Sequence, residues 1–264
     1  MDKKVKVLYF VDRMRHGGIQ QLAVEIAKHI SKDIQMDFMV LNDGQTYPLE
    51  NTIKKLGYNL YKIDAWVYKP TDYINYYQKI DEFFKEHHDY KIVHINTSSK
   101  NFLILKIAKR YKIPVRIAHS HNIGFQSKNK VQILMGNMFK PLLKKYATDY
   151  FACSRLAGEW LFGKKNVEEG KVKIIHNAVD YQKFKLNEKI RNNIRQELNI
   201  EDKLVIGHVG RFTNQKNHTF LIDIFNEIHQ KNKKTVLMLV GIGEKEEEIR
   251  EKVKKINIEQ NVLF

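Results

Sequence analysis

The chain has 264 residues, which is enough to bury a substantial core as one large domain or two of moderate size. Its composition, 43% hydrophobic and 29% charged, indicates a globular protein and excludes the disordered and fibrous classes. Lysine and arginine number 46 against 30 acidic residues, which favours a polyanionic partner such as a membrane surface, nucleic acid or a phosphorylated substrate. No zinc-finger, RNA-recognition or helix-turn-helix motif appears, so we expect no nucleic-acid partner.

The sequence predicts a cytoplasmic location. No apolar run approaches the roughly 20 residues that span a bilayer, and the first residues lack the features of a signal peptide. The single cysteine, Cys153, cannot form an internal disulfide and fits a reducing compartment. Because it follows Tyr-Phe-Ala, we expect it to lie in a buried strand and to have a packing role.

Short apolar runs alternate with helical patterns along the first part of the chain. The predicted strands cover residues 5–11, 36–41, 60–63, 92–96, 115–118, 150–152 and 172–175. The predicted helices have an apolar face over 22–30 and then cover 49–56, 73–85, 102–111 and 131–147. This alternation predicts a parallel α/β sheet with helices on both faces.

The same alternation starts again after the polar stretch 177–198. Strands are predicted at 204–209, 236–240 and 262–264, with helices at 220–229 and 246–256 between them. We therefore expect two Rossmann-like domains, over 1–180 and 181–264. The second has about three strands where a doubly wound sheet usually has about five or more, so we expect it to be incomplete, with the chain truncated at its C-terminus.

Two stretches combine glycine with possible phosphate contacts. Gly17 and Gly18 follow the first strand at the start of a helix, where free N–H groups and the helix dipole favour phosphate, although a tight turn would also explain them. In the second domain, Gly210 ends a strand, and Arg211 and Lys216 follow it. This order places two cations at the carboxyl edge of a sheet, where open α/β folds bind ligands.

Several ordered motifs resemble glycosyltransferase family 4, in particular its bacterial capsule and exopolysaccharide members. GGIQQLA is similar to the family's N-terminal glycine loop, and HVGRFTNQKNH with LMLVGIGEKEEEI is similar to its donor-domain signature. His176-Asn177-Ala178-Val179-Asp180 resembles the interdomain Asn-Gly-Val-Asp element, with alanine in place of glycine. The resemblance covers essentially all 264 residues. It implies a two-Rossmann (GT-B) enzyme that uses a nucleotide sugar, such as a UDP-sugar, as co-substrate.

The resemblance also implies roles for individual residues. Gly17 and Gly18 would contact the donor diphosphate from the first domain. Gly210, Arg211 and Lys216 would contact it from the second, with the two cations neutralising charge as the nucleotide leaves. His119 matches the family histidine near the transferred sugar and the acceptor, and His121 and Asn122 would lie on the acceptor side.

We expect no metal cofactor. His119 and His121 form an H-x-H pair, but no third ligand stands at an evident spacing, and no Asp-x-Asp of the metal-dependent glycosyltransferase fold occurs in the chain. The chain also departs from the family, because Gln20 replaces a glutamate and the family's paired glutamates would lie beyond Val262. Glu251 and Glu259 share the spacing of that pair, but their context is a charged helix, so we expect them to face solvent. Without the paired glutamates we expect weak or no transfer.

Family members retain anomeric configuration, by a mechanism that mainly orients donor and acceptor and stabilises the departing diphosphate. The implied acceptor is a saccharide, plausibly lipid-linked, which would place the enzyme at the inner face of the plasma membrane. Leu134, Met138 and Leu142 share one helical face near lysines, as an anionic membrane surface would require. The alternative is a core helix whose lysines extend to the surface.

Two other functions stay open from the sequence. One is a different enzyme on the same scaffold, such as a UDP-sugar 2-epimerase. The other is a basic module that binds a membrane or polyanion without catalysis.

Overall fold

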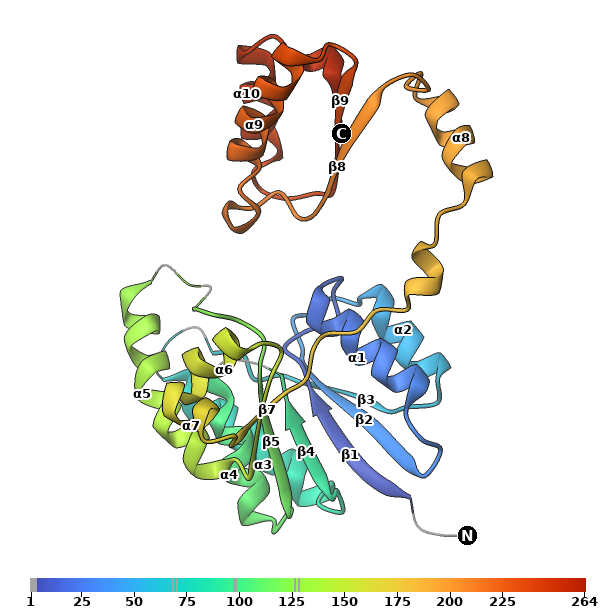
Figure 1. Ribbon diagram of the computed structural model, residues 1–264. Helices are drawn as coiled ribbons and strands as arrows, with labels where there is room; N and C mark the ends of the chain where they lie inside the picture. Colours follow the sequence, from blue (N-terminus) through green and yellow to red (C-terminus); the bar gives the residue numbers. More distant parts are fainter. Residues whose placement is uncertain (1–3, 68, 70, 97–98, 126, 128) are drawn as a thin grey trace. The chain divides into compact units, whose positions relative to one another are not determined.

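The computed structural model describes residues 4–67, 69, 71–96, 99–125, 127 and 129–264. The chain folds into two compact units, Met1–Asp180 (the N-terminal unit) and Tyr181–Phe264 (the C-terminal unit). Each unit contains a parallel sheet with helices packed against it (Figure 1). The predicted α/β class is confirmed.

The N-terminal unit has a seven-stranded parallel sheet in the order β3-β2-β1-β4-β5-β6-β7. Its strands are β1 (Val5–Phe10), β2 (Ile34–Leu41), β3 (Leu60–Ile63), β4 (Ile92–Ile95), β5 (Val115–Ser120), β6 (Asp149–Ala152) and β7 (Val172–Ile174). The order reverses between β1 and β4, which are neighbours in the sheet although β2 and β3 separate them in the chain. The carboxyl ends of β1 and β4 therefore form a switch point, the place where open α/β sheets bind ligands.

Helices cover both faces of this sheet (Figure 1). They are α1 (Gly18–His29), α2 (Pro48–Lys55), α3 (Asp72–Glu86), α4 (Phe102–Arg110), α5 (Lys130–Tyr146), α6 (Arg155–Phe162) and α7 (Lys164–Glu168), with the 3-10 turn η1 (Ser99–Asn101) before α4. Side chains of α1 and α2 pack with Tyr9 and Phe38 on one face. Those of α3, α4, α5 and α6 pack with Leu8 and Phe10 on the other, because successive strand residues point to opposite faces.

The C-terminal unit has a three-stranded parallel sheet in the order β10-β9-β8. Its elements are η2 (Tyr181–Phe184), α8 (Glu188–Glu197), β8 (Leu204–Val209), η3 (Asn214–Lys216), α9 (His218–Lys231), β9 (Thr235–Val240), α10 (Glu246–Lys255), η4 (Glu259–Asn261) and β10 (Val262–Leu263). Its core is formed by Phe212, Ile222 and Phe225 against Leu237 and Leu239 of the sheet. Glu251 and Glu259 are both exposed, as predicted.

Three helices are absent from the sequence prediction. Helix α8 lies in the polar stretch 177–198, where Ile190 and Ile194 are its only apolar side chains, and α6 and α7 are short, with eight and five residues. Cys153 was expected inside a strand, but it follows β6 and is half-buried against the core. His119 was expected after a strand, but it lies within β5, which continues to Ser120 because Ser120 pairs with Ala152 of β6.

Candidate functional site

Gly17 and Gly18 lie at the carboxyl edge of the N-terminal sheet, where the loop after β1 enters α1. Gly17 is the N-cap of α1 with an extended backbone (φ −175°), and no side chain of the described residues caps this helix start. A Cβ atom on Gly17 would meet only the flexible Gln20 side chain, and one on Gly18 would have no heavy atom within 4 Å. Neither backbone strain nor packing against the described residues explains why position 18 is a glycine. The space beside Gly18 is open to a ligand.

Three histidines gather at the next strands along the same sheet. His119 of β5 is 2% exposed, and its Nδ1 lies 3.1 Å from Nε2 of His94 in β4. His121 follows β5, with its ring centroid 4.0 Å from that of His119. Among the described residues, neither His119 Nε2 nor His121 Nδ1 has a hydrogen-bond partner. Buried polar atoms are nearly always paired, so these two buried nitrogens need a partner that the described residues do not provide.

Asn96 determines which nitrogen of His121 carries the proton. Its Nδ2 donates to the carbonyl of Phe10 (3.3 Å), and its Oδ1 accepts from the Tyr9 hydroxyl (3.0 Å). His121 Nε2 lies 3.0 Å from the same Oδ1. Since an amide oxygen only accepts, His121 Nε2 must donate, and the unpaired Nδ1 is then an acceptor. This nitrogen is suited to a ligand hydroxyl.

Burial lowers the pKa of all three imidazoles, because a charged ring would lose its hydration. The pKa falls to about 3 for His94, about 2 for His119 and about 4 for His121. For His94 and His119, charge repulsion from a neighbouring histidine lowers the pKa further. At neutral pH the rings are uncharged, so they can position hydroxyl groups but do not supply a cation.

The C-terminal unit carries the predicted cations on the loop after β8. Arg211 is exposed, and Lys216 ends η3. Within the part of the chain that the structure describes, neither forms an ion pair. The Lys216 side chain crosses over Gly210, because a Cβ atom on that glycine would lie 3.3 Å from Lys216 Cδ and Cε. The loop therefore presents two uncompensated positive charges at the carboxyl edge of its sheet.

A second glycine loop, with Gly241 and Gly243 of the LMLVGIGEKEEEI stretch, supports the first. A Cβ atom on Gly241 would lie 2.1 Å from the Gly210 oxygen, and one on Gly243 would lie 2.4 Å from the Phe212 oxygen. The two loops also exchange backbone hydrogen bonds, from Gly210 to Val240 (2.9 Å) and from Phe212 to Ile242 (3.0 Å). The two glycines after β9 let the second loop pack directly against the first. This packing fixes the backbone that carries Arg211.

Gly241→Ala is expected to destabilise the C-terminal unit by about 2–4 kcal/mol, because the new Cβ would overlap a backbone oxygen that cannot move away. Hydrogen exchange of the β8 and β9 amides measures this loss. Gly207→Ala is the matched control, since Gly207 lies in β8 with no heavy atom within 4 Å of its Cβ position. Equal exchange in the two variants would contradict the packing argument.

Among the described residues, no three histidine, cysteine, aspartate or glutamate side chains converge into a metal-binding group. Asn122 follows His121 and lines a cavity of about 520 Å³ with Asn96. Sequence reasoning missed His94 and Asn96, and the signal available was a polar residue inside or directly after a buried strand.

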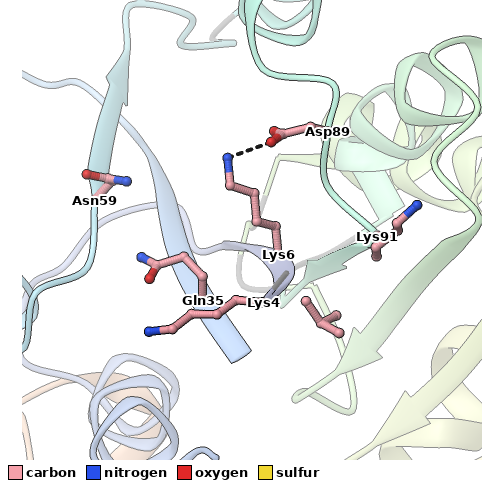
Figure 2. A pocket seen from close by; sticks show the side chains of 7 residues that line it. Lys4, Lys6, Gln35, Asn59, Asp89 and Lys91 are labelled. Atoms are coloured by element: carbon pink, nitrogen blue, oxygen red, sulfur yellow. Dashed lines mark hydrogen bonds and ion pairs between the residues drawn. The ribbon is translucent and has the colours of Figure 1, made fainter. Parts of the chain in front are cut away.

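A different cavity, of about 620 Å³, lies at the amino ends of the strands (Figure 2). Lys6 and Gln35 line it near the starts of β1 and β2, and Asp89 approaches from before β4 with an ion pair of 2.7 Å to Lys6. This edge is opposite to the carboxyl ends that carry Gly18 and His121. Because parallel sheets bind ligands at their carboxyl edge, we assign the candidate site there and not to this cavity.

Helix α5 has an exposed apolar face. Leu134 is 62% and Met138 64% exposed, whereas Leu142 packs against the core. The core-helix alternative is therefore wrong for Leu134 and Met138. Among the described residues, no helix is both long and apolar enough to span a membrane.

The comparisons with known proteins identify the family. The model of "Glycosyltransferase Family 4" matches residues 16–183, and that of "Glycosyl transferases group 1" matches residues 190–264. The chain belongs to glycosyltransferase family 4. The predicted enzyme class, a glycosyltransferase, is confirmed.

Two relatives of this family 4 glycosyltransferase are bacterial proteins. EpsF of Bacillus subtilis (strain 168), which bears the name of a glycosyltransferase, is 30% identical over 98% of this chain and 67% of its own length. The capsular polysaccharide biosynthesis glycosyltransferase CapH of Staphylococcus aureus is 21% identical over 90% of this chain and 62% of its own. The chain thus spans about two thirds of these relatives.

Solved structures confirm the predicted GT-B fold of this glycosyltransferase. Anabaena Alr3699/HepE in complex with UDP and glucose superposes with a TM-score of 0.78 at 18% identity, over 98% of this chain and 68% of that one. Neisseria meningitidis UDP-GlcNAc 2-epimerase bound to UDP-GlcNAc gives 0.62 at 13% identity, over 98% and 71%. The architecture of this glycosyltransferase therefore also occurs in an epimerase, and the fold alone does not distinguish the two activities.

Proposed function

We propose that the reaction of this chain, at a low rate, is the transfer of a sugar from a UDP-sugar to a saccharide acceptor in the synthesis of a bacterial surface polysaccharide. The observation that carries the proposal is the pair Arg211 and Lys216, two unpaired cations on a glycine-supported loop. A nucleotide diphosphate has the charge that such a pair would compensate. The Anabaena structures with UDP and UDP-glucose support the choice of donor, and the names of EpsF and CapH support the class of product.

On this proposal, the chain's residues act by positioning and by electrostatics. Arg211 and Lys216 bind the donor diphosphate and stabilise the negative charge that develops as the sugar leaves. Gly17 and Gly18 leave the start of α1 open to an anionic group of a ligand without steric obstruction. His121 Nδ1 accepts a hydrogen bond from a sugar hydroxyl, and His119 Nε2 contacts a second polar group. We infer that this apparatus needs no metal and retains the anomeric configuration.

We also propose a place of action. The acceptor is lipid-linked, and the enzyme works at the inner face of the plasma membrane, bound peripherally. The exposed side chains of Leu134 and Met138 and the net charge of +16 favour contact with an anionic membrane surface.

Product analysis tests the proposed reaction. The chain is incubated with UDP-GlcNAc or UDP-glucose and a lipid-linked saccharide, and the products are measured by mass spectrometry over long times. An acceptor lengthened by one sugar supports the proposal. A UDP-sugar epimerised at C2 with unchanged acceptor would show an epimerase instead, and binding to anionic vesicles without any affinity for UDP would show a non-catalytic module.

A further inference from the structure

Two histidines of the C-terminal unit lie beside its cationic loop and have no role in the transfer proposed above. His208 is the last residue but one of β8, and His218 is the first residue of α9. Their rings meet edge to face, with centroids 4.7 Å apart. They form a second group of histidines in the chain, in addition to His94, His119 and His121 of the N-terminal unit.

The ring of His208 and the side chain of Lys216 contact the same glycine. A Cβ atom on Gly210 would lie 3.1 Å from His208 Cε1 and 3.3 Å from Lys216 Cδ and Cε. The imidazole and the lysine stem therefore meet over the backbone of Gly210. An anion bound by Lys216 would lie near this imidazole and would favour its charged form.

The described residues leave ring nitrogens of the pair without partners. Nδ1 of His208 and both ring nitrogens of His218 are buried and form no hydrogen bond with a described residue. His218 is 2% exposed and also packs edge-on against Phe212, at 4.7 Å between centroids. A proton can therefore bind at His208 Nδ1 without breaking a hydrogen bond to any described residue.

The groups on the loop oppose a positive imidazole in the free chain. Burial lowers the pKa of His218, and the charges of His208 and Lys216 lower it further. Arg211, on the same loop, is a second cation that forms no ion pair with a described residue. A positive charge on His208 would add to the charges of this loop.

The other elements packed against the pair supply no compensating charge. On β9, the residue paired with His208 is Leu239, which is uncharged. From α10, Lys245 and Glu248 line a cavity of about 40 Å³ together with His218, and they form an ion pair with each other. Further along α10, Lys252 is paired with Asp223 of α9. A negative partner for the imidazole must therefore come from a ligand.

We propose that His208 is a proton-binding residue of the donor site, which takes up a proton from solvent when a nucleotide diphosphate binds at Arg211 and Lys216. The negative charges of the diphosphate offset the charge of the loop and stabilise the positive imidazole. The protonated ring then adds a third cation beside the diphosphate. Because the bound chain carries more protons than the free chain, donor affinity rises as the pH falls. This inference rests on the proposed binding of the donor.

UDP-glucose is the probe, because its diphosphate has no terminal phosphate group whose second pKa of about 6 would change the ligand's own charge. Calorimetry of the 264-residue chain near pH 7 is run in PIPES and in imidazole buffer, which differ in their heats of ionisation. Proton uptake makes the heat of binding differ between the two buffers. The affinity of the wild-type chain should also rise by about threefold or more from pH 8 to pH 6.5.

His208→Gln removes the titrating ring and keeps the capacity for hydrogen bonding. It should abolish the difference in heat between the buffers and reduce the change in affinity to less than about 1.5-fold. His229→Gln is the matched control, because His229 lies at the other end of α9, where its Nδ1 is 3.0 Å from Thr235 Oγ1. This control should take up the same number of protons as the wild-type chain.

His208→Phe is the second variant, since it keeps an aromatic ring against His218 and should lose the proton uptake as well. Circular dichroism verifies the fold of each variant. UDP-glucose binding with equal heats in the two buffers would overturn this inference alone, and so would uptake that persists in both His208 variants or that is lost equally in His229→Gln. A chain without affinity for UDP-glucose at any pH would overturn the proposed donor site itself.

Discussion

Replacing Arg211 and Lys216 together with alanine is expected to weaken UDP binding by at least about 100-fold, because each charge-assisted contact to phosphate contributes about 1.5–3 kcal/mol. Neither side chain forms an ion pair with a described residue, so the loss measures contacts to the ligand and not the rupture of a native pair. Calorimetric titration of UDP into the wild-type and variant chains gives both dissociation constants.

The control is a second double variant, which also removes two positive charges but removes them at the opposite edge of the same sheet. Lys233 and Lys234 precede β9 at its amino end and are exposed. Replacing both with alanine should change UDP affinity by less than about threefold at physiological ionic strength, because screening limits the influence of distant surface charges. An equal loss in the two double variants would mean that only the net positive charge attracts the nucleotide.

The histidine cluster should make the N-terminal unit sensitive to acid. The pKa of His94, His119 and His121 is lowered from 6.5 to about 3, 2 and 4 in the folded chain. Below pH 6.5 the unfolded chain takes up protons that the folded chain cannot, so stability is fully present above 6.5 and is lost as the pH falls. From pH 7.5 to 5.5 this amounts to about 1.4 kcal/mol for each ring, or on the order of 4 kcal/mol for all three.

Urea unfolding followed by tryptophan fluorescence measures this effect, because both tryptophans, Trp66 and Trp160, lie in the N-terminal unit. His94→Phe should reduce the pH dependence by about a third, since one of three buried rings no longer titrates. The control is His88→Phe, because His88 is an exposed residue outside the cluster. A pH dependence that stays the same in His94→Phe would contradict the assignment.

Periodic apolar residues predicted most of the fold. The bounds of β3 (Leu60–Ile63) and β8 (Leu204–Val209) agree with the sequence prediction, because short runs of apolar residues between turn signals indicate strands of a parallel sheet. Helix α8 was missed because only Ile190 and Ile194 of its ten residues are apolar. Its available signal was Asn187, whose side chain accepts from the Ile190 N–H at 3.1 Å as an N-cap.

Helix α6 was missed for a different reason. It is short and contains Gly158, a residue that weakens a helix prediction. The structure gives the reason for this glycine, since a Cβ atom there would lie 3.1–3.3 Å from side chains of Val167, Val172 and Ala152. Helix α6 can pack closely against β6 and β7 because Gly158 has no Cβ atom. That packing could not be inferred from local sequence.

The candidate site was partly predictable. Gly18 and Lys216 follow the loops after β1 and β8, and His119 is the last residue but one of β5, so all three belong to the carboxyl edges where parallel sheets collect ligand contacts. His94 and Asn96 were missed because their importance comes from pairing: β4 lies beside β5, which brings His94 to His119 across 25 positions of sequence. Such neighbours depend on strand order, which periodicity alone does not give. Their roles toward donor and acceptor stay predictions.

The contact between the Gly210 backbone and the Gly241 loop has a kinetic consequence. Because the two loops are hydrogen-bonded to each other within one unit, the backbone that carries Arg211 is ordered before any nucleotide arrives. The ordering entropy is then lost during folding and does not oppose association. Nucleotide capture should therefore proceed in a single phase whose rate rises linearly with nucleotide concentration and falls with ionic strength, with no slower rearrangement of this loop afterwards.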